Sequence, residues 1–335
     1  MARKKWISSL ILVLMVIVLA ACNSAEGESS SNNKKITIKV ATTSGKDSLI
    51  YDAAVLFKEK VEERSNGNMK VTIYDNGQLG KDATVLDALK SGSIEMSIPS
   101  SVLTTKAPEF GVFDIPFLFD DRSKVETIAN GDIWNKDLKS LLPEHGLVGL
   151  GFWENGYRQI TNNTRPINTP EDLEGIKLRV PDSAIRVAMF KELGANPTPM
   201  DLNEVFTALQ QGVVDGQENP LSTTNGVKLQ QVQKYLSMTN HVYTPVYLVS
   251  SKKWYDKLSK EDQELLTKAA DEVGNEIRKK GEDIDEKLIK QFEEEGVKVN
   301  TADMEAFKKQ TEPIIELFYK EMDKEFVDKV IEAAK

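Results

Sequence analysis

Apolar and polar residues alternate along the first third of the chain in the periods of strands and helices. Residues 36–40 alternate with a period of two, which predicts a strand, and residues 47–64 gather apolar side chains on one helical face. A strand at 71–74, a helix at 82–89 and a strand at 94–98 follow. This is the spacing of a β-α-β-α-β unit, so we expect a mostly parallel sheet.

A second strand–helix alternation occupies the middle of the chain. Apolar runs predict strands at 146–153 and 176–180, and helices at 182–193 and 203–211 each stop at a glycine. This repeat of the alternation indicates a second α/β lobe that begins near residue 155.

The last third of the chain changes character. Residues 215–218 are interpreted as a polar turn, and residues 242–251, rich in Tyr and Val, as an extended segment. Residues 259–262 form a capping box that opens a long helical pattern. A helix of about 30 residues would be roughly 45 Å long. That length exceeds one small lobe, so we expect the helix to brace both lobes.

The N-terminus has the pattern of a secretory signal peptide. A basic start at residues 3–5 precedes an apolar run at residues 7–21, which is short for a membrane span of about 20 residues. The run ends in Leu-Ala-Ala-Cys, which resembles the bacterial lipobox. Cys22 would then be the first residue of the mature chain and carry a lipid. The alternative is a buried free thiol in a retained signal anchor.

The segment that follows fits an anchored protein. Residues 23–35 are rich in Ser, Asn, Gly and Glu and nearly free of apolar residues, so they suit a flexible tether. We predict a signal peptide at 1–21, a lipidated tether at 22–35, and an extracytoplasmic body anchored to the cell membrane by the lipid on Cys22. Globular proteins that a lipid anchors outside the membrane are typically receptors, binding proteins or secreted hydrolases.

Composition narrows the function further. The 335 residues include 43 Lys and Arg against 52 Asp and Glu, and the net charge of −9 argues against a nucleic-acid partner, which needs a basic surface. One Cys excludes an intrachain disulfide, a zinc-thiolate site and an iron–sulfur cluster. Two His leave little material for a histidine-rich metal site. We therefore expect neither a metal nor a cofactor.

The common catalytic signatures are missing from the sequence. It has no phosphate loop, no complete dinucleotide fingerprint, no His-Glu-x-x-His and no Gly-x-Ser-x-Gly. His145 and His241 lie far apart and are interpreted as surface or structural histidines. A hydrolase that uses only a carboxylate pair stays open, because such pairs have no fixed sequence spacing.

Two arginines stand where an anion could bind. Arg179 ends its predicted strand, and with Leu178 and Val180 facing inward its side chain should point to the other face. Open α/β lobes bind ligands at such strand ends. Arg158 follows the preceding apolar strand. A guanidinium grips a carboxylate through two parallel hydrogen bonds, so the pair predicts an anion site, with surface ion pairs as the alternative.

Several segments resemble the DctP-type substrate-binding proteins of tripartite ATP-independent periplasmic (TRAP) transporters. The similarity covers roughly residues 36–335. Its most specific part combines Gly-Ile-Lys-Leu-Arg-Val-Pro at 175–181 with the runs at 193–200 and 204–220. Shorter matches lie at 77–80, 92–95 and 239–241. The signal peptide and lipobox point independently to the same class of bacterial lipoprotein.

The resemblance implies an α/β, two-lobe fold of the periplasmic-binding-protein type, with crossing strands and a long helix that spans both lobes. The first lobe would comprise residues 36–155 plus 245–284, and the second residues 156–244 plus 285–335. The ligand would lie between the lobes, which close over it. The loaded protein would then dock on two integral membrane subunits, and an ion gradient would drive uptake.

The resemblance also implies roles for single residues. Arg179 would clamp the ligand carboxylate, Arg158 would assist it, and Asn219 would border the same carboxylate. The distal part of the ligand would meet Thr43, Asp82 and Ser100.

Fewer residues bear on the identity of the ligand. Residues 152–156 resemble members that bind sugar acids such as uronates, and also members that bind dicarboxylates. Glu154 is a candidate acceptor for sugar hydroxyls, or a turn carboxylate. Tyr243 is a candidate for stacking or hydrogen bonding in the cleft, or for packing in a crossing strand. Ser100 stands where sialic-acid-binding members carry a carboxylate, which disfavours sialic acid.

We therefore predict an extracytoplasmic solute-binding protein, not an enzyme, that captures a small organic acid for a TRAP transporter. The acid would be a sugar acid such as a uronate, or a C4-dicarboxylate. One alternative is a lipid-anchored carbohydrate-active hydrolase that uses a carboxylate pair. Another is an ABC-type or sensor-linked binding protein of the same two-lobe build.

Overall fold

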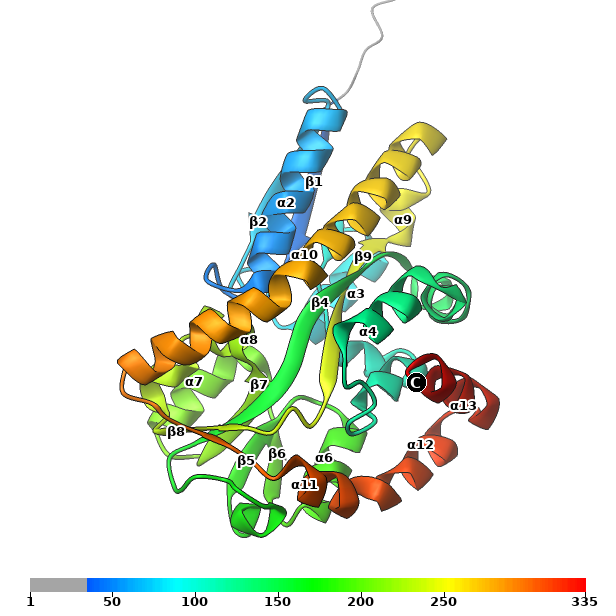
Figure 1. The fold of residues 1–335 in the computed structure, drawn as a ribbon. Coiled ribbons are helices and arrows are strands. Elements are labelled where there is room, and N and C mark those ends of the chain that lie inside the picture. Colours follow the sequence, from blue (N-terminus) through cyan, green and yellow to red (C-terminus); the bar gives the residue numbers. More distant parts are fainter. Residues whose placement is uncertain (1–34) are drawn as a thin grey trace, which may run out of the picture. The chain divides into compact units, whose positions relative to one another are not determined.

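A mixed sheet of ten strands runs through residues 35–335, the part of the chain that this computed structural model describes (Figure 1). Its strands are β1 (Ile36–Ala41), β2 (Met69–Tyr74), β3 (Met96–Ser97), β4 (Leu147–Asn162), β5 (Lys177–Val180), β6 (Asn196–Pro199), β7 (Gly216–Pro220), β8 (Tyr235–Met238), β9 (Tyr243–Ser251) and β10 (Lys298–Thr301). The order is β2-β1-β3-β9-β4-β7-β5-β6, and β8 pairs with both β4 and β10. The predicted signal peptide, the lipid site at Cys22 and nearly all of the tether lie outside the described residues.

The first strand–helix alternation forms as predicted. β1 pairs in parallel with β2 and with β3, and the connecting helices are α2 (Leu49–Arg64) and α3 (Asp82–Ser91). Helix α2 begins after Ser48, whose side chain accepts a hydrogen bond from the N–H of Tyr51. Helix α3 ends at Gly92, which takes a left-handed φ of 82°. The prediction of parallel pairing in this unit is confirmed.

Two long strands cross the middle of the sheet and make it mixed. β4 has 16 residues and pairs antiparallel with β9, so the prediction that this strand stops at residue 153 is wrong. It continues because the polar side chains beyond Trp153 find partners inside the protein: Glu154 meets Arg122, and Arg158 meets Glu218. The pairing shifts register between Glu154 and Gly156, which is the mark of a bulge.

Residues 215–218, predicted as a polar turn, are mostly strand. β7 is buried at all five positions, antiparallel to β4 and parallel to β5. Its polar side chains are accepted in the interior because each is hydrogen-bonded. Gln217 Nε2 donates to Thr161 Oγ1, Asn219 Nδ2 donates to Gln217 Oε1, and Glu218 binds two arginines.

Helices cover the sheet. Besides α2 and α3 they are α4 (Arg122–Asn130), α5 (Lys139–Leu141), α6 (Ala184–Glu192), α7 (Leu202–Gln210), α8 (Leu221–Gly226), α9 (Lys252–Tyr255), α10 (Lys260–Glu294), α11 (Met304–Thr311), α12 (Ile315–Glu321) and α13 (Lys324–Ala333). A π-helical segment, η3, spans Ile133–Leu138. Short 3₁₀ segments are η1 (Ser101–Thr105), η2 (Pro108–Asp114), η4 (Pro143–His145), η5 (Pro170–Leu173), η6 (Leu229–Val232) and η7 (Glu312–Ile314).

Helix α10 is the long helix that the capping box predicts. Ser259 accepts the N–H of Asp262, and the helix runs for 35 residues, about 50 Å. Its first half packs against α2 and β4, and its second half against α8 and β10 (Figure 1). Two separate apolar cores hold it: Val273 belongs to the core around β1 and α2, and Phe292 to the core around α8 and β8. The helix therefore braces both ends of the sheet.

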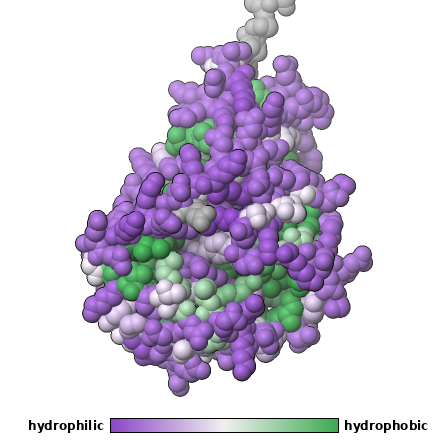
Figure 2. All heavy atoms as spheres, in the orientation of Figure 1, coloured by the Kyte–Doolittle hydropathy of each residue, from purple (hydrophilic) through white to green (hydrophobic). Residues whose placement is uncertain are grey.

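Hydrophilic residues cover most of the face seen in Figure 2, and hydrophobic residues gather in its lower half. Val213 and Met304 are the large hydrophobic side chains that stand exposed among the described residues. Within residues 35–335, no helix combines the length and the apolar character needed to cross a membrane.

Gly45 holds the loop after β1 against the end of α8. A Cβ atom at this position would lie 2.0 Å from the carbonyl oxygen of Gly226. We expect Gly45→Ala to lower the free energy of unfolding by about 1–3 kcal/mol, because the backbone must move to admit the methyl group. Urea unfolding measures the change, and a midpoint equal to that of the unchanged protein would contradict the tight contact.

Candidate functional site

A cavity opens beside the carboxyl ends of β1, β3, β5 and β7, the edge at which open α/β sheets bind ligands. Six of the eight binding residues predicted from the sequence line it: Thr43, Asp82, Ser100, Arg158, Arg179 and Asn219. The rest of its wall mixes apolar, hydroxyl, amide and acidic side chains. Among these are Ile50, Ile98, Val102, Met200, Leu202, Val246, Ser44, Ser101, Thr223, Asn155, Asp182 and Asp201.

Arg179 is a buried positive charge at this wall. It lies on β5 with 3% of its surface exposed, and its Nε and Nη2 atoms donate to the carbonyl oxygen of Met200 at 2.9 and 2.6 Å. Within residues 35–335 no acidic side chain forms an ion pair with it. Burial, together with the charge of Arg158, lowers the pKa of Arg179 to about 10, so it remains charged at neutral pH. The remaining guanidinium donors are available to an anion.

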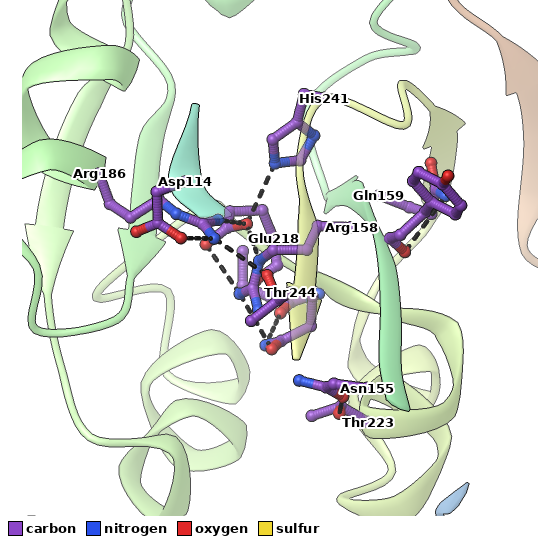
Figure 3. Close-up of polar contacts among 12 residues, drawn as sticks. Asp114, Asn155, Arg158, Gln159, Arg186, Glu218, Thr223, His241 and Thr244 are labelled. Carbon is purple, nitrogen blue, oxygen red and sulfur yellow. Dashed lines mark hydrogen bonds and ion pairs between the residues drawn. The ribbon is translucent and has the colours of Figure 1, made fainter. Parts of the chain in front are cut away.

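Arg158, on β4, is already paired by the protein (Figure 3). Its Nε and Nη2 atoms bind both carboxylate oxygens of Glu218, with 2.8 Å between Nη2 and Oε1. Nη2 also donates to Oδ1 of Asn219 at 3.0 Å. Asn219 in turn donates from Nδ2 to Oε1 of Gln217 at 2.6 Å. The guanidinium of Arg158 and the amide of Asn219 are therefore held in fixed orientations at the cavity wall.

Glu218 is the centre of a buried network (Figure 3). Arg186 Nη1 donates to its Oε2 at 2.9 Å, and His241 Nε2 lies 3.1 Å from the same oxygen. Arg186 Nη2 donates to Oδ1 of Asp114 at 2.7 Å. Burial by itself opposes ionisation of Glu218, but the charges of Arg158 and Arg186 outweigh it and hold its pKa well below the usual range. Two arginines thus face two carboxylates, and the network is balanced in charge.

Asp82, the first residue of α3, faces the cavity from another side. Thr43 Oγ1 donates to its two carboxylate oxygens at 3.3 and 3.2 Å. Burial raises the pKa of Asp82 to about 6, although the Thr43 hydrogen bond acts in the opposite direction. Ser100 Oγ donates to the carbonyl oxygen of Pro245 at 2.9 Å.

Comparison with known proteins identifies the family. The chain matches the DctP family, described as bacterial extracellular solute-binding protein, family 7, over residues 40–322. This protein is a member of the DctP family. The resemblance to this family that the sequence motifs indicate is therefore confirmed.

Named relatives and solved structures agree with this assignment. The chain is 36% identical over 257 residues to the 2,3-diketo-L-gulonate-binding periplasmic protein YiaO of Escherichia coli, covering 76% of this chain and 78% of YiaO. The sugar acid binding protein of Advenella mimigardefordensis, in complex with galactonate, superposes with a TM-score of 0.86 at 41% identity, covering 90% of this chain and 98% of that one. A TRAP periplasmic solute-binding protein of Sulfurospirillum deleyianum with bound succinate gives 0.84 at 33% identity, covering 90% and 99%.

These likenesses confirm several predictions. The α/β fold class of the DctP proteins is confirmed, and the protein is a solute-binding protein rather than an enzyme, so the hydrolase alternative is set aside. The family works outside the cytoplasm. The predicted lobe boundaries, 36–155 with 245–284 and 156–244 with 285–335, stay predictions, as does the lipid on Cys22.

Glu154 and Tyr243, the other two predicted ligand contacts, are absent from the cavity lining of this DctP protein. Glu154 is buried on β4, where Oε1 accepts from Nε of Arg122 at 2.9 Å and Oε2 accepts from the hydroxyl of Tyr243. Arg122 Nη2 continues to Oδ2 of Asp285 at 2.6 Å. Burial raises the pKa of Glu154. The structure places the pair at the β4–β9 bulge, where it links these strands to α4 and α10.

The sequence predicts no role for Arg186 or Asp114, which lie behind the cavity wall, and it predicts a turn at Glu218. Arg186 does lie on the apolar face of a predicted helix, an unusual position for a charge. His241 is buried and bonded through Nδ1 to Thr239, which confirms its interpretation as a structural histidine.

The part of the chain that the structure describes contains no group of three or more His, Cys, Asp or Glu side chains arranged to hold a metal ion.

Proposed function

We propose that this protein captures a small organic acid, a sugar acid or a C4-dicarboxylate, and delivers it to the integral membrane subunits of a TRAP transporter. The observation that carries the proposal is Arg179, a buried guanidinium at the cavity wall that donates to a backbone carbonyl and, within residues 35–335, forms no ion pair. A buried charge is costly without a partner, and the carboxylate of a ligand would supply one.

The neighbours of Arg179 support a clamp for one carboxylate. Arg158 and Asn219 lie on the adjacent strands β4 and β7 and line the same cavity. Because Glu218 and Gln217 hold them, they would meet the ligand without the entropy loss of ordering two long side chains. Exclusion of water around the bound acid would strengthen each contact.

The ligands named for similar proteins have a carboxylate group in common. The names of those proteins give 2,3-diketo-L-gulonate, galactonate and succinate, all of which carry a carboxylate. The proposed clamp recognises that shared group, and the rest of the cavity would select among the acids.

The proposed site of action is the outer side of the cell membrane. Residues 1–21 would be cleaved as a signal peptide, and a lipid on Cys22 with the tether to residue 35 would hold the body there. The lobes on either side of the cavity would close over the acid, with the crossing strands β4 and β9 taking up the motion.

A thermal-shift screen of the chain without residues 1–21 tests the function. Galactonate, glucuronate, succinate, pyruvate and sialic acid form the panel, with the neutral sugar galactose as the control. A ligand present at 100 times its Kd should add about 2.7 kcal/mol of stability. We expect at least one acid to raise Tm and galactose to leave it unchanged. If no acid raised Tm, or galactose did so equally, the proposed function would be wrong.

A further inference from the structure

One lysine joins two sides of the cavity where the cavity meets solvent. Lys81 precedes helix α3, and its Nζ atom lies 2.8 Å from Oδ2 of Asp201 and 2.5 Å from Oε1 of Glu204, both at the start of α7. Asp201 lines the cavity and also has 34% of its side chain exposed. On the other side Asp82, which follows Lys81 directly, lines the cavity from α3. These ion pairs therefore stand between the cavity and the solvent.

Helices α3 and α7 belong to different apolar cores. The buried side chains of α3, such as Leu86, pack in the core that contains Phe113, whereas those of α7, such as Leu209, pack in a separate small core with Leu229. By the predicted boundaries, α3 lies in the first lobe and α7 in the second. Within residues 35–335 the ion pairs of Lys81 therefore link two helices that share no apolar core.

The starts of both helices depart from the usual capping preferences. Asp201 is the N-cap residue of α7 and Glu204 stands three positions later, which is the pattern of a capping box, yet the side chain of Asp201 caps no backbone N–H of the helix. Lys81 is the N-cap residue of α3, where its positive charge lies at the positive end of the helix dipole. Departures from local preference of this kind are expected at functional positions.

The segment that Lys81 holds also orients the proposed clamp. The carbonyl oxygen of Met200 accepts the hydrogen bonds of Arg179, and Asp201 is the next residue. If the lobes separate to release an acid, α3 must move away from α7. Lys81 must then part from both carboxylates.

We propose that Lys81, Asp201 and Glu204 form an ion-pair latch that holds the cavity closed and slows the release of a bound acid. The inference rests on the proposed function, because it concerns an acid already held at Arg179. It makes Lys81 a positioning residue, which acts through the start of α7. The three side chains are 34–49% exposed, so the latch is weak enough to open and should be sensitive to salt.

Stopped-flow kinetics of the chain without residues 1–21 test the latch. Galactonate is the probe if it raises Tm, and otherwise the acid of the thermal-shift panel that raises Tm most. We expect Lys81→Met to raise the rate constant of release about fivefold and to leave that of association unchanged, because the open protein lacks the contact. Glu204→Gln, which removes one carboxylate outside the cavity lining, should raise it about twofold. Lys81→Arg keeps the charge and should release the acid as slowly as the unchanged protein.

Lys60→Met is the matched control. Lys60 also lies between two carboxylates, those of Glu272 and Glu276, but it joins α2 to α10 and lies outside the cavity lining. This variant should leave the rate of release unaltered. In about 1 M NaCl, where the screening length falls to about 3 Å, the difference between Lys81→Met and the unchanged protein should shrink.

Equal rates of release from Lys81→Met and the unchanged protein would overturn the latch, and so would an equal rise in Lys60→Met. A lower Tm of ligand-free Lys81→Met without faster release would assign the ion pairs to the fold alone. Glu204→Gln decides the matter if Lys81→Met does not fold. In each of these cases the proposed function stands, because an acid still binds. If the unchanged protein bound no acid of the panel, the proposed function would be wrong and the latch with it.

Discussion

Replacement of Arg179 by Met is expected to abolish the binding of organic acids while leaving the ligand-free protein at least as stable as before. Loss of one partner from a buried, hydrogen-bonded charge pair typically costs 2–5 kcal/mol of binding free energy. On that basis we expect affinity to fall by about 100-fold or more. The carboxylate of the ligand would then meet a wall whose remaining arginine, Arg158, has its positive charge balanced by Glu218.

The stability of the ligand-free protein is expected to rise or to stay level, for a separate reason. Arg179 is 3% exposed, carries its charge among apolar and polar neighbours, and has no acidic partner in the described part of the chain. Burial opposes that charge, as the lowered pKa of Arg179 also indicates. Met fills much of the same volume without charge, so the change removes a desolvation cost. If Arg179 served only to stabilise the fold, Arg179→Met would instead lower the free energy of unfolding of the ligand-free protein.

Two further variants separate charge from geometry. Arg179→Lys keeps a positive charge but offers a single ammonium in place of a planar fork, so we expect a smaller loss, about 10-fold or more. Arg165→Met is the matched control, because Arg165 also donates to backbone carbonyls, those of Asp172 and Glu174, and lies outside the cavity lining. Titration calorimetry measures affinity and urea unfolding measures stability. Tight binding by Arg179→Met, or a loss caused equally by Arg165→Met, would contradict the clamp.

The elements that the sequence predicts well are those whose signals are local. The strand at β1, helix α2 and the cap of α10 follow from apolar periodicity and from a serine three residues before an acid. These signals depend on neighbours within a few positions, which the chain displays directly.

Strands with polar side chains escape this kind of reasoning. β7 contains Gln217, Glu218 and Asn219, which normally indicate a turn or a surface. They form a buried strand because Arg158 and Arg186, from other parts of the chain, pair with them. A long-range partner of this kind leaves no periodicity in the sequence.

The residues of the candidate site also differ in whether the sequence predicts them. Arg179 could be predicted because its strand is short and apolar and because ligands bind at strand ends. The network behind it could not, because the ion pair of Arg186 with Asp114 joins helix α6 to segment η2. Glu154 shows the converse case: it follows an apolar stretch and is predicted as a ligand contact, whereas in the structure Arg122, from a distant part of the chain, donates to its carboxylate.

Glu218→Gln is expected to cause the largest loss of stability among the substitutions considered. Glu218 is fully buried and its carboxylate is shared by Arg158, Arg186 and His241. Within residues 35–335, removal of its charge leaves Arg186 paired with Asp114 and leaves Arg158 without an ion-pair partner. Breaking a buried ion pair on one side costs about 3–5 kcal/mol. Urea unfolding of the ligand-free protein should show this loss, although Gln differs from Glu by a single atom.

The pH dependence of unfolding gives a second measure of the same interaction. Because the folded protein holds the pKa of Glu218 below its usual value near 4.5, the unfolded chain takes up this proton first as the pH falls. The stabilisation is therefore present in full above that value and is lost below it, from about pH 5 downward. We expect the unchanged protein to lose stability more steeply than Glu218→Gln over this range. Glu293→Gln, the same change at an exposed position of α10, should follow the unchanged protein at every pH. Equal slopes for the unchanged protein and Glu218→Gln would mean that Glu218 does not carry the charge that holds Arg158 and Arg186 together.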